Sequence, residues 1–127
     1  MNITLPDDAG EHADALRCIL EHFGEGWPHR LSCGPGWYPI LNELQARLSA
    51  IDPGYEVQQV KEKFGTLRFY WSWSEDASDE AIKAGEEVVS EAERLSATTC
   101  EVCGSGEGER VTRNGFWMKT LCPRCAA

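Results

Sequence analysis

Two cysteine pairs of equal spacing near the C-terminus constrain this chain more than any other feature. Cys100-Glu-Val-Cys103 and Cys122-Pro-Arg-Cys125 are C-x2-C pairs separated by eighteen residues. Each pair lets two thiolates bind the same tetrahedral ion, and the length between the pairs is typical of a zinc ribbon. The spacing therefore predicts one Zn²⁺ ion held by Cys100, Cys103, Cys122 and Cys125.

The residues between the pairs predict the hairpin that brings them together. Residues 110–113 and 116–120 suit two strands, and Asn114-Gly115 between them is a strong type I′ turn signal. Four thiolates complete the coordination sphere and leave no position for an activated water, so we expect a structural zinc. Such an ion folds a segment that has little apolar core of its own.

The expected cellular compartment favours cysteines that bind metal over cysteines that form disulfides. The start of the chain, MNITLPDDAGEHAD, has neither the basic nor the apolar region of a secretion signal, so we expect a cytoplasmic protein in a reducing environment. Redox dithiols or two disulfides are the alternatives. No apolar run approaches the ~20 residues that cross a bilayer, so no membrane partner is expected.

The two remaining cysteines raise the question of a second metal. Cys18 and His22 are one helical turn apart, and His29 and Cys33 have the same separation in the loop beyond. A C-x3-H and H-x3-C site is conceivable there. The alternative for Cys33 is a small packed residue that precedes the turn at 34–36.

Apolar periodicity predicts three helices and one hairpin. The helices are expected at about 9–23, with Asp7 or Asp8 as cap, from about 39 to 51, and at about 79–96. Alternation of Leu67, Phe69, Trp71 and Trp73 with polar residues predicts a strand with that set in the core. Residues 55–61 would pair with it through a turn near Lys63-Phe64-Gly65, which leaves Arg68 and Tyr70 on the opposite face.

These elements predict an α+β fold. It combines three helices with a short antiparallel β-hairpin and a C-terminal zinc ribbon that has four cysteine ligands. We expect an α+β core domain over 1–96 and the ribbon, over 97–127, packed on it.

Charge is unevenly distributed along the chain. Residues 1–99 hold eighteen acidic and eight basic side chains, for a net charge of −10, whereas residues 100–127 hold three and four, for +1. A field of this sign repels phosphate backbones, so broad nucleic-acid binding is disfavoured. A local basic patch could still bind nucleic acid.

Four segments resemble one family. Cys33-Gly-Pro-Gly-Trp37, QVKEKFGTLRFY at 59–70, TCEVCG at 99–104 and TLCPRC at 120–125 resemble a family of small proteins encoded in bacteriophage and prophage genomes. In that family the last ligand position is often His, where this chain has Cys125, which is also a competent zinc ligand. The resemblance implies a phage-type setting in a bacterial host and a zinc site, but no activity.

No catalytic constellation stands out, so we expect a binding protein rather than an enzyme. The favoured function is recognition of a host or phage protein, such as inhibition of a host or defence protein, by a zinc-stabilised accessory module. Its candidate contact residues are Lys61, Lys63, Arg68 and Tyr70. The alternative is a nucleic-acid or nucleotide binder that adds the ribbon cations Arg110, Arg113, Lys119 and Arg124.

Overall fold

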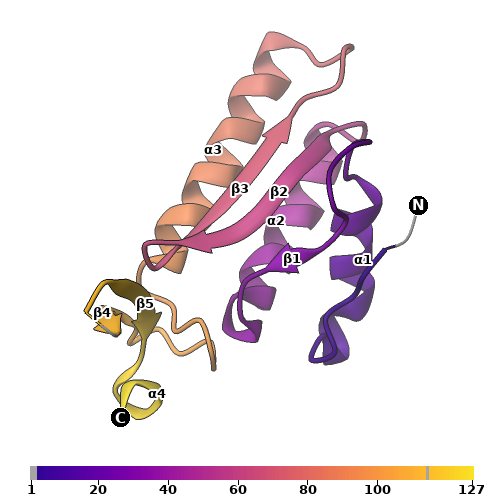
Figure 1. Ribbon diagram of the computed structural model, residues 1–127. Coiled ribbons are helices and arrows are strands. Elements are labelled where there is room, and N and C mark those ends of the chain that lie inside the picture. Colours follow the sequence, from indigo (N-terminus) through magenta and orange to yellow (C-terminus); the bar gives the residue numbers. More distant parts are fainter. Residues whose placement is uncertain (1–2, 114) are drawn as a thin grey trace.

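The chain forms the expected α+β fold, with helices, one three-stranded sheet and a separate C-terminal hairpin (Figure 1). The computed structural model describes residues 3–113 and 115–127. Among these residues, no helix is long and apolar enough to span a bilayer. The elements in chain order are η1 (Gly10–His12), α1 (Ala13–Glu21), β1 (Leu31–Ser32), η2 (Pro35–Trp37), α2 (Tyr38–Ile51), β2 (Glu56–Lys63), β3 (Thr66–Ser72), α3 (Asp79–Ser96), β4 (Glu109–Arg113), β5 (Trp117–Leu121) and α4 (Pro123–Ala126).

The larger sheet has the strand order β1-β2-β3. Strands β2 and β3 form the predicted antiparallel hairpin, with Val60 opposite Phe69, and the turn lies at Phe64 and Gly65, both of which have positive φ. Strand β1 was not predicted, and it runs parallel to β2 with Leu31 beside Val60. Two residues in a Gly- and Pro-rich loop carry no periodic signal, so only the completed sheet reveals them.

The helices pack on one side of this sheet and create the main apolar core (Figure 1). Helix α2 lies between α1 and α3, and α3 also packs against β3. Inward positions of β2 and β3 complete the cluster. Its largest fully buried side chains are Trp37, Tyr38, Tyr55, Leu16, Ile19, Leu20, Leu41, Leu44, Leu48, Leu67, Val57 and Val60.

Helix α3 has the predicted bounds, whereas α1 is shorter than expected. The Ser78 hydroxyl caps α3 by accepting the Ala81 N–H at 3.1 Å. Helix α1 begins after a 3₁₀ turn and has no side-chain cap. The prediction that Asp7 or Asp8 caps it was therefore wrong, and Asp8 instead accepts a hydrogen bond from the Tyr38 hydroxyl at 2.7 Å.

The predicted alternation holds through β3 and fails at its end. Leu67 and Phe69 are buried, as expected, and Trp71 is half-buried. Trp73 was expected in the core but lies beyond the strand and is 43% exposed, with its ring edge-on to Trp71 at 5.9 Å. The strand ends at Ser72, so period-two alternation no longer determines where the next side chain points.

The outer edge of β3 is covered by side chains of α3. The Leu67 N–H donates to the Ser96 hydroxyl at 2.8 Å, and the Phe69 N–H donates to the Glu93 carboxylate at 2.9 Å. Backbone groups that a further strand would otherwise pair with are thus already bonded.

The C-terminal ribbon consists of β4, β5 and α4. Strands β4 and β5 pair antiparallel, with Glu109 opposite Leu121 and Arg113 opposite Trp117. Of the predicted Asn114-Gly115 turn, Asn114 lies outside the described residues and Gly115 has the positive φ of 83° that such a turn requires. The ribbon contributes only a small apolar cluster built on Cys100, Leu121 and Cys122.

Candidate metal centre and adjoining surfaces

The four cysteines of the two C-x2-C pairs converge on one point. All four sulfur atoms lie within 4.8 Å of one another, and Cys103 Sγ is 3.6 Å from Cys122 Sγ. A tetrahedral zinc with bonds of about 2.3 Å separates its sulfur ligands by about 3.8 Å. The arrangement therefore fits a single zinc ion bound by Cys100, Cys103, Cys122 and Cys125.

Local backbone structure orients each pair. After Cys103 the chain turns sharply at Gly104, whose φ is +84° and whose N–H donates to the Cys100 carbonyl at 2.9 Å. Cys122 is the N-cap residue of α4, and this single turn of helix presents Cys125 on the same side. Both pairs thus sit where a turn brings residues i and i+3 together.

The four clustered thiols influence one another's protonation. Burial favours the neutral form of Cys100, but hydrogen bonds from the backbone N–H groups of Cys103, Cys122 and Val102 outweigh it and lower the pKa of Cys100 to about 6. Hydrogen bonding with Cys122 and Cys100 raises the pKa of Cys125 to about 12. A divalent ion removes this competition by stabilising all four thiolates at once.

The ribbon docks on the body through Glu101, a residue between the first two ligands. The Gly36 N–H donates to the Glu101 carbonyl at 2.7 Å, and the Gly34 N–H donates to its carboxylate at 2.9 Å. A Cβ at Gly36 would lie 2.1 Å from the Cys100 carbonyl, so only glycine allows this close approach. The Trp37 indole N–H also donates to the Thr99 carbonyl at 2.8 Å.

A cluster of three charged side chains lies at the same junction. Lys119 Nζ is 3.2 Å from Glu62 and 3.4 Å from Glu101, whose side chains are only 10% and 5% exposed. Burial lowers the pKa of Lys119, but the two carboxylates outweigh it, Glu101 most strongly, and the net shift is upward. Glu62 also accepts the Gly65 N–H at 2.8 Å, and the Thr120 hydroxyl donates to the Gly65 carbonyl. Lys119, considered above as a nucleic-acid contact, is therefore an internal ion-pair partner.

Sequence reasoning missed this junction. Acidic residues between two zinc ligands or in a strand rich in charge are normally exposed, so the residue types of Glu101 and Glu62 did not indicate burial. The available signal for Glu62 was its spacing of two residues from Val60, which places both side chains on the same face of β2. A bulge between Val57 and Gln59 makes this the inward face.

The conceivable second metal site does not form. Both ring nitrogens of His22 face carbonyl oxygens, of Cys18 at 2.7 Å and of Pro53 at 3.1 Å, and the ring stacks on Tyr55. Cys18 donates to the Gln45 side chain at 3.2 Å. Within residues 3–113 and 115–127, only the four ribbon cysteines form a group of three or more His, Cys, Asp or Glu side chains close enough to share an ion.

The candidate contact residues share the outer face of the β2–β3 hairpin. The strand register places Lys61 directly opposite Arg68, and Lys63 and Tyr70 have the same outward parity. Tyr70 is 42% exposed, and Lys61 Nζ lies 6.0 Å from the centre of its ring. The Nε atom of Arg68 is buried and has no hydrogen-bond partner among the described residues. We call these four residues the outer-face patch.

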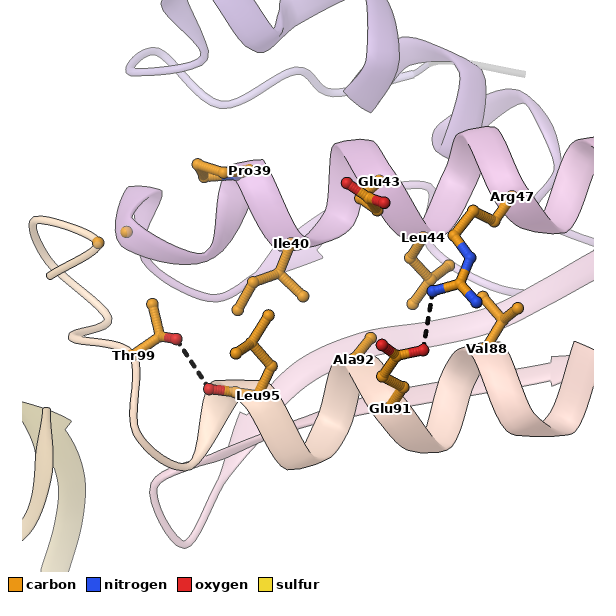
Figure 2. Close-up of a pocket in the computed structure, with 12 residues that line it drawn as sticks. Pro39, Ile40, Glu43, Leu44, Arg47, Val88, Glu91, Ala92, Leu95 and Thr99 are labelled. Carbon is orange, nitrogen blue, oxygen red and sulfur yellow. Dashed lines mark hydrogen bonds and ion pairs between the residues drawn. The ribbon is translucent and has the colours of Figure 1, made fainter. Parts of the chain in front are cut away.

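A groove of about 450 Å³ runs between α2 and α3 (Figure 2). Ile40, Leu44, Val88 and Ala92 form its buried apolar floor. An ion pair between Arg47 and Glu91, 2.8 Å long, spans the groove (Figure 2). Its lining also includes Gly104, the residue that follows Cys103. The groove adjoins the metal centre without sharing a ligand with it.

Comparisons of the chain with protein-family models, with curated proteins and with solved structures give no match.

Proposed function

We propose that this chain is a small zinc-stabilised accessory protein of phage type that binds a protein partner, such as a host or defence protein that it inhibits. The zinc is structural in this proposal, because four thiolates occupy the whole coordination sphere. The outer-face patch provides the contact surface, and no catalysis is involved.

The observation that carries the proposal is the segregation of charge on the sheet. The chain has a net charge of −9, yet the outward positions from Gln59 to Lys63 and from Thr66 to Tyr70 include three cations and no carboxylate. Lys61 faces Arg68 directly across the strands, a pairing of like charges that destabilises a sheet. An unfavourable local arrangement of this kind is expected where a partner compensates it.

A protein partner is favoured over nucleic acid by the rest of the surface. Helix α3, beside β3, carries six acidic residues, including Glu86, Glu87 and Glu91, all three of which are exposed. A long polyanion would meet this field beyond the patch, whereas a folded protein or short acidic segment need not. The exposed ring of Tyr70 beside Lys61 is the specific observation for the second candidate, binding of single-stranded nucleic acid.

Two measurements test the proposal. Metal analysis of the purified protein should give one zinc per chain, since the four sulfurs complete one site. Affinity capture from host lysate, with and without nuclease, should retain a protein partner in both arms. The double variant Lys61→Glu with Arg68→Glu should lose it, and Lys83→Glu, an exposed charge reversal on α3, is the matched control.

Binding of single-stranded nucleic acid, the second candidate function, predicts a different result in the capture experiment. If phosphates were the ligand, capture would depend on untreated nucleic acid and affinity would fall steeply with salt. That result would overturn the protein-binding proposal and leave the zinc site intact.

A further inference from the structure

The tips of the two hairpins expose three large aromatic side chains side by side. Phe64 of the β2–β3 turn is 55% exposed, and Phe116 and Trp117 of the ribbon are 82% and 56% exposed. Together with Lys63 and Met118 they line a hollow of about 330 Å³, which we call the tip hollow. Clustered exposed apolar surface of this kind marks an interaction site more often than an isolated exposed residue does.

The backbone at Phe64 indicates that this ring is present for a reason other than folding. Phe64 has a φ of +55°, the only positive φ of a non-glycine residue among the described residues. A bulky side chain in this conformation costs conformational free energy that glycine or asparagine would largely avoid. An exposed ring held at that cost contributes nothing to the core.

The hollow is held in shape by contacts between the two hairpins. The Thr120 hydroxyl donates to the Gly65 carbonyl, and a Cβ at Gly65 would lie 3.1 Å from the Thr120 oxygen. Phe64 comes from the body, and Phe116 and Trp117 come from the ribbon that the four cysteines organise. The site is therefore complete only while the ribbon is folded.

The free charge around the tip hollow is positive. Lys63 Nζ lies 5.5 Å from the centre of the Phe64 ring, and Lys63 also belongs to the outer-face patch. The carboxylate in the lining, Glu62, is bonded to Lys119 and to the Gly65 N–H. An incoming ligand thus meets apolar rings next to cations that have no internal carboxylate partner among the described ion pairs.

We propose that the tip hollow takes one apolar or aromatic side chain of an acidic protein segment, whose carboxylates lie along Lys61, Lys63 and Arg68. This inference rests on the proposed function and specifies its partner. Charge complementarity selects an acidic segment, and the rings select an anchor residue within it.

The probe is a short glutamate-rich peptide with one central phenylalanine, compared with the same peptide carrying alanine there. Both are titrated into the zinc-loaded full chain and followed by amide chemical shifts. The phenylalanine peptide should bind roughly tenfold or more tightly than the alanine peptide, as burial of one aromatic side chain allows. Shifts should include Phe64, Trp117 and Lys63.

Phe64→Gly is the decisive variant, because glycine adopts a φ of +55° without strain and the fold is retained. It should remove the preference for phenylalanine while leaving the affinity for the alanine peptide unchanged. Trp73→Ala, which removes an exposed ring elsewhere on the body, should keep the preference.

The outcomes separate the two proposals. Equal affinity for both peptides, with binding still abolished by Lys61→Glu and Arg68→Glu, overturns the tip hollow and supports the outer-face patch. Absence of binding by either peptide overturns the acidic-segment partner. Tight binding of oligothymidylate that depends on Phe64 and competes with the peptides assigns the hollow to nucleobases and overturns both protein proposals.

Discussion

The body and the ribbon of this chain use different physical means to reach an ordered state. Within residues 3–113 and 115–127, the body joins three helices and a sheet through nineteen buried apolar residues, whereas the ribbon has a cluster of three, two of them candidate metal ligands. A body of this kind is stabilised by removal of apolar surface from water, and the ribbon would be stabilised by metal coordination. One chain can therefore contain two regions whose stabilities respond to different perturbations.

The largest expected effect is the loss of one metal ligand. Cys100→Ser should release zinc and unfold the ribbon, because structural zinc contributes about 10–16 kcal/mol in isolated zinc-finger peptides. The body should remain folded on its own core. Hydrogen exchange and metal analysis check this, and Cys18→Ser, a thiol outside the metal centre, is the control. Global unfolding of Cys100→Ser would abolish the distinction between the two regions.

Truncation of a side chain in the core of the body should destabilise the body and leave the zinc site intact. Leu41 is fully buried in the body, and Leu41→Ala should lower the free energy of unfolding by about 2–5 kcal/mol through lost burial and a residual cavity. Under native conditions the variant should still bind one zinc. Denaturant unfolding and metal analysis together measure both quantities, and zinc loss from the folded variant would mean that the ribbon depends on the body's packing.

A smaller loss of stability is expected at the junction between the ribbon and the body. Glu101→Ala removes a buried acceptor of the Gly34 N–H and an ion-pair partner of Lys119, and should cost about 1–3 kcal/mol. Glu101→Gln retains an acceptor and should cost less. Hydrogen exchange should show Gly34 losing protection in the alanine variant. Glu107→Ala, an exposed carboxylate of the same ribbon, is the matched control, and an equal effect there would deny Glu101 its docking role.

The smallest effect is expected for an ion pair within the body. Arg47 and Glu91 are 45% and 57% exposed, so Arg47→Ala should change the free energy of unfolding less than any of the substitutions above. A double-mutant cycle with Glu91→Ala isolates the pair, and its coupling should weaken with salt. If the coupling free energy of Arg47 with Glu91 were as large as that of Glu101 with Lys119, burial would not explain the difference expected between the two ion pairs.

The sequence predicted what local patterns determine. Helix α3 has a cap, acidic residues in its first turn and an apolar stripe, so its bounds were found, and the equal spacing of the cysteine pairs identified the candidate zinc site. The outward parity of Arg68 and Tyr70 also followed from the alternation in β3, and the strand register confirms it.

What the sequence could not predict depends on contacts between distant segments. Strand β1 exists because β2 lies beside it, and the Glu101 carboxylate is buried because a glycine loop 67 residues away donates a hydrogen bond to it. Trp73 reads as one more member of an alternating strand, and only the end of that strand after Ser72 exposes it. The start of α1 was misplaced because an acidic pair before a helix suits a cap, while Asp8 found a partner in Tyr38.

The covered edge of β3 has a consequence for how this molecule meets others of its own kind. An open strand edge recruits identical chains and begins aggregation. Here Ser96 and Glu93 occupy the N–H groups of Leu67 and Phe69, so these two groups are not available to pair with the edge of an identical chain. Two polar side chains of one helix thereby close the edge of the sheet and leave its broad outer face open, which is the face that we propose for recognition.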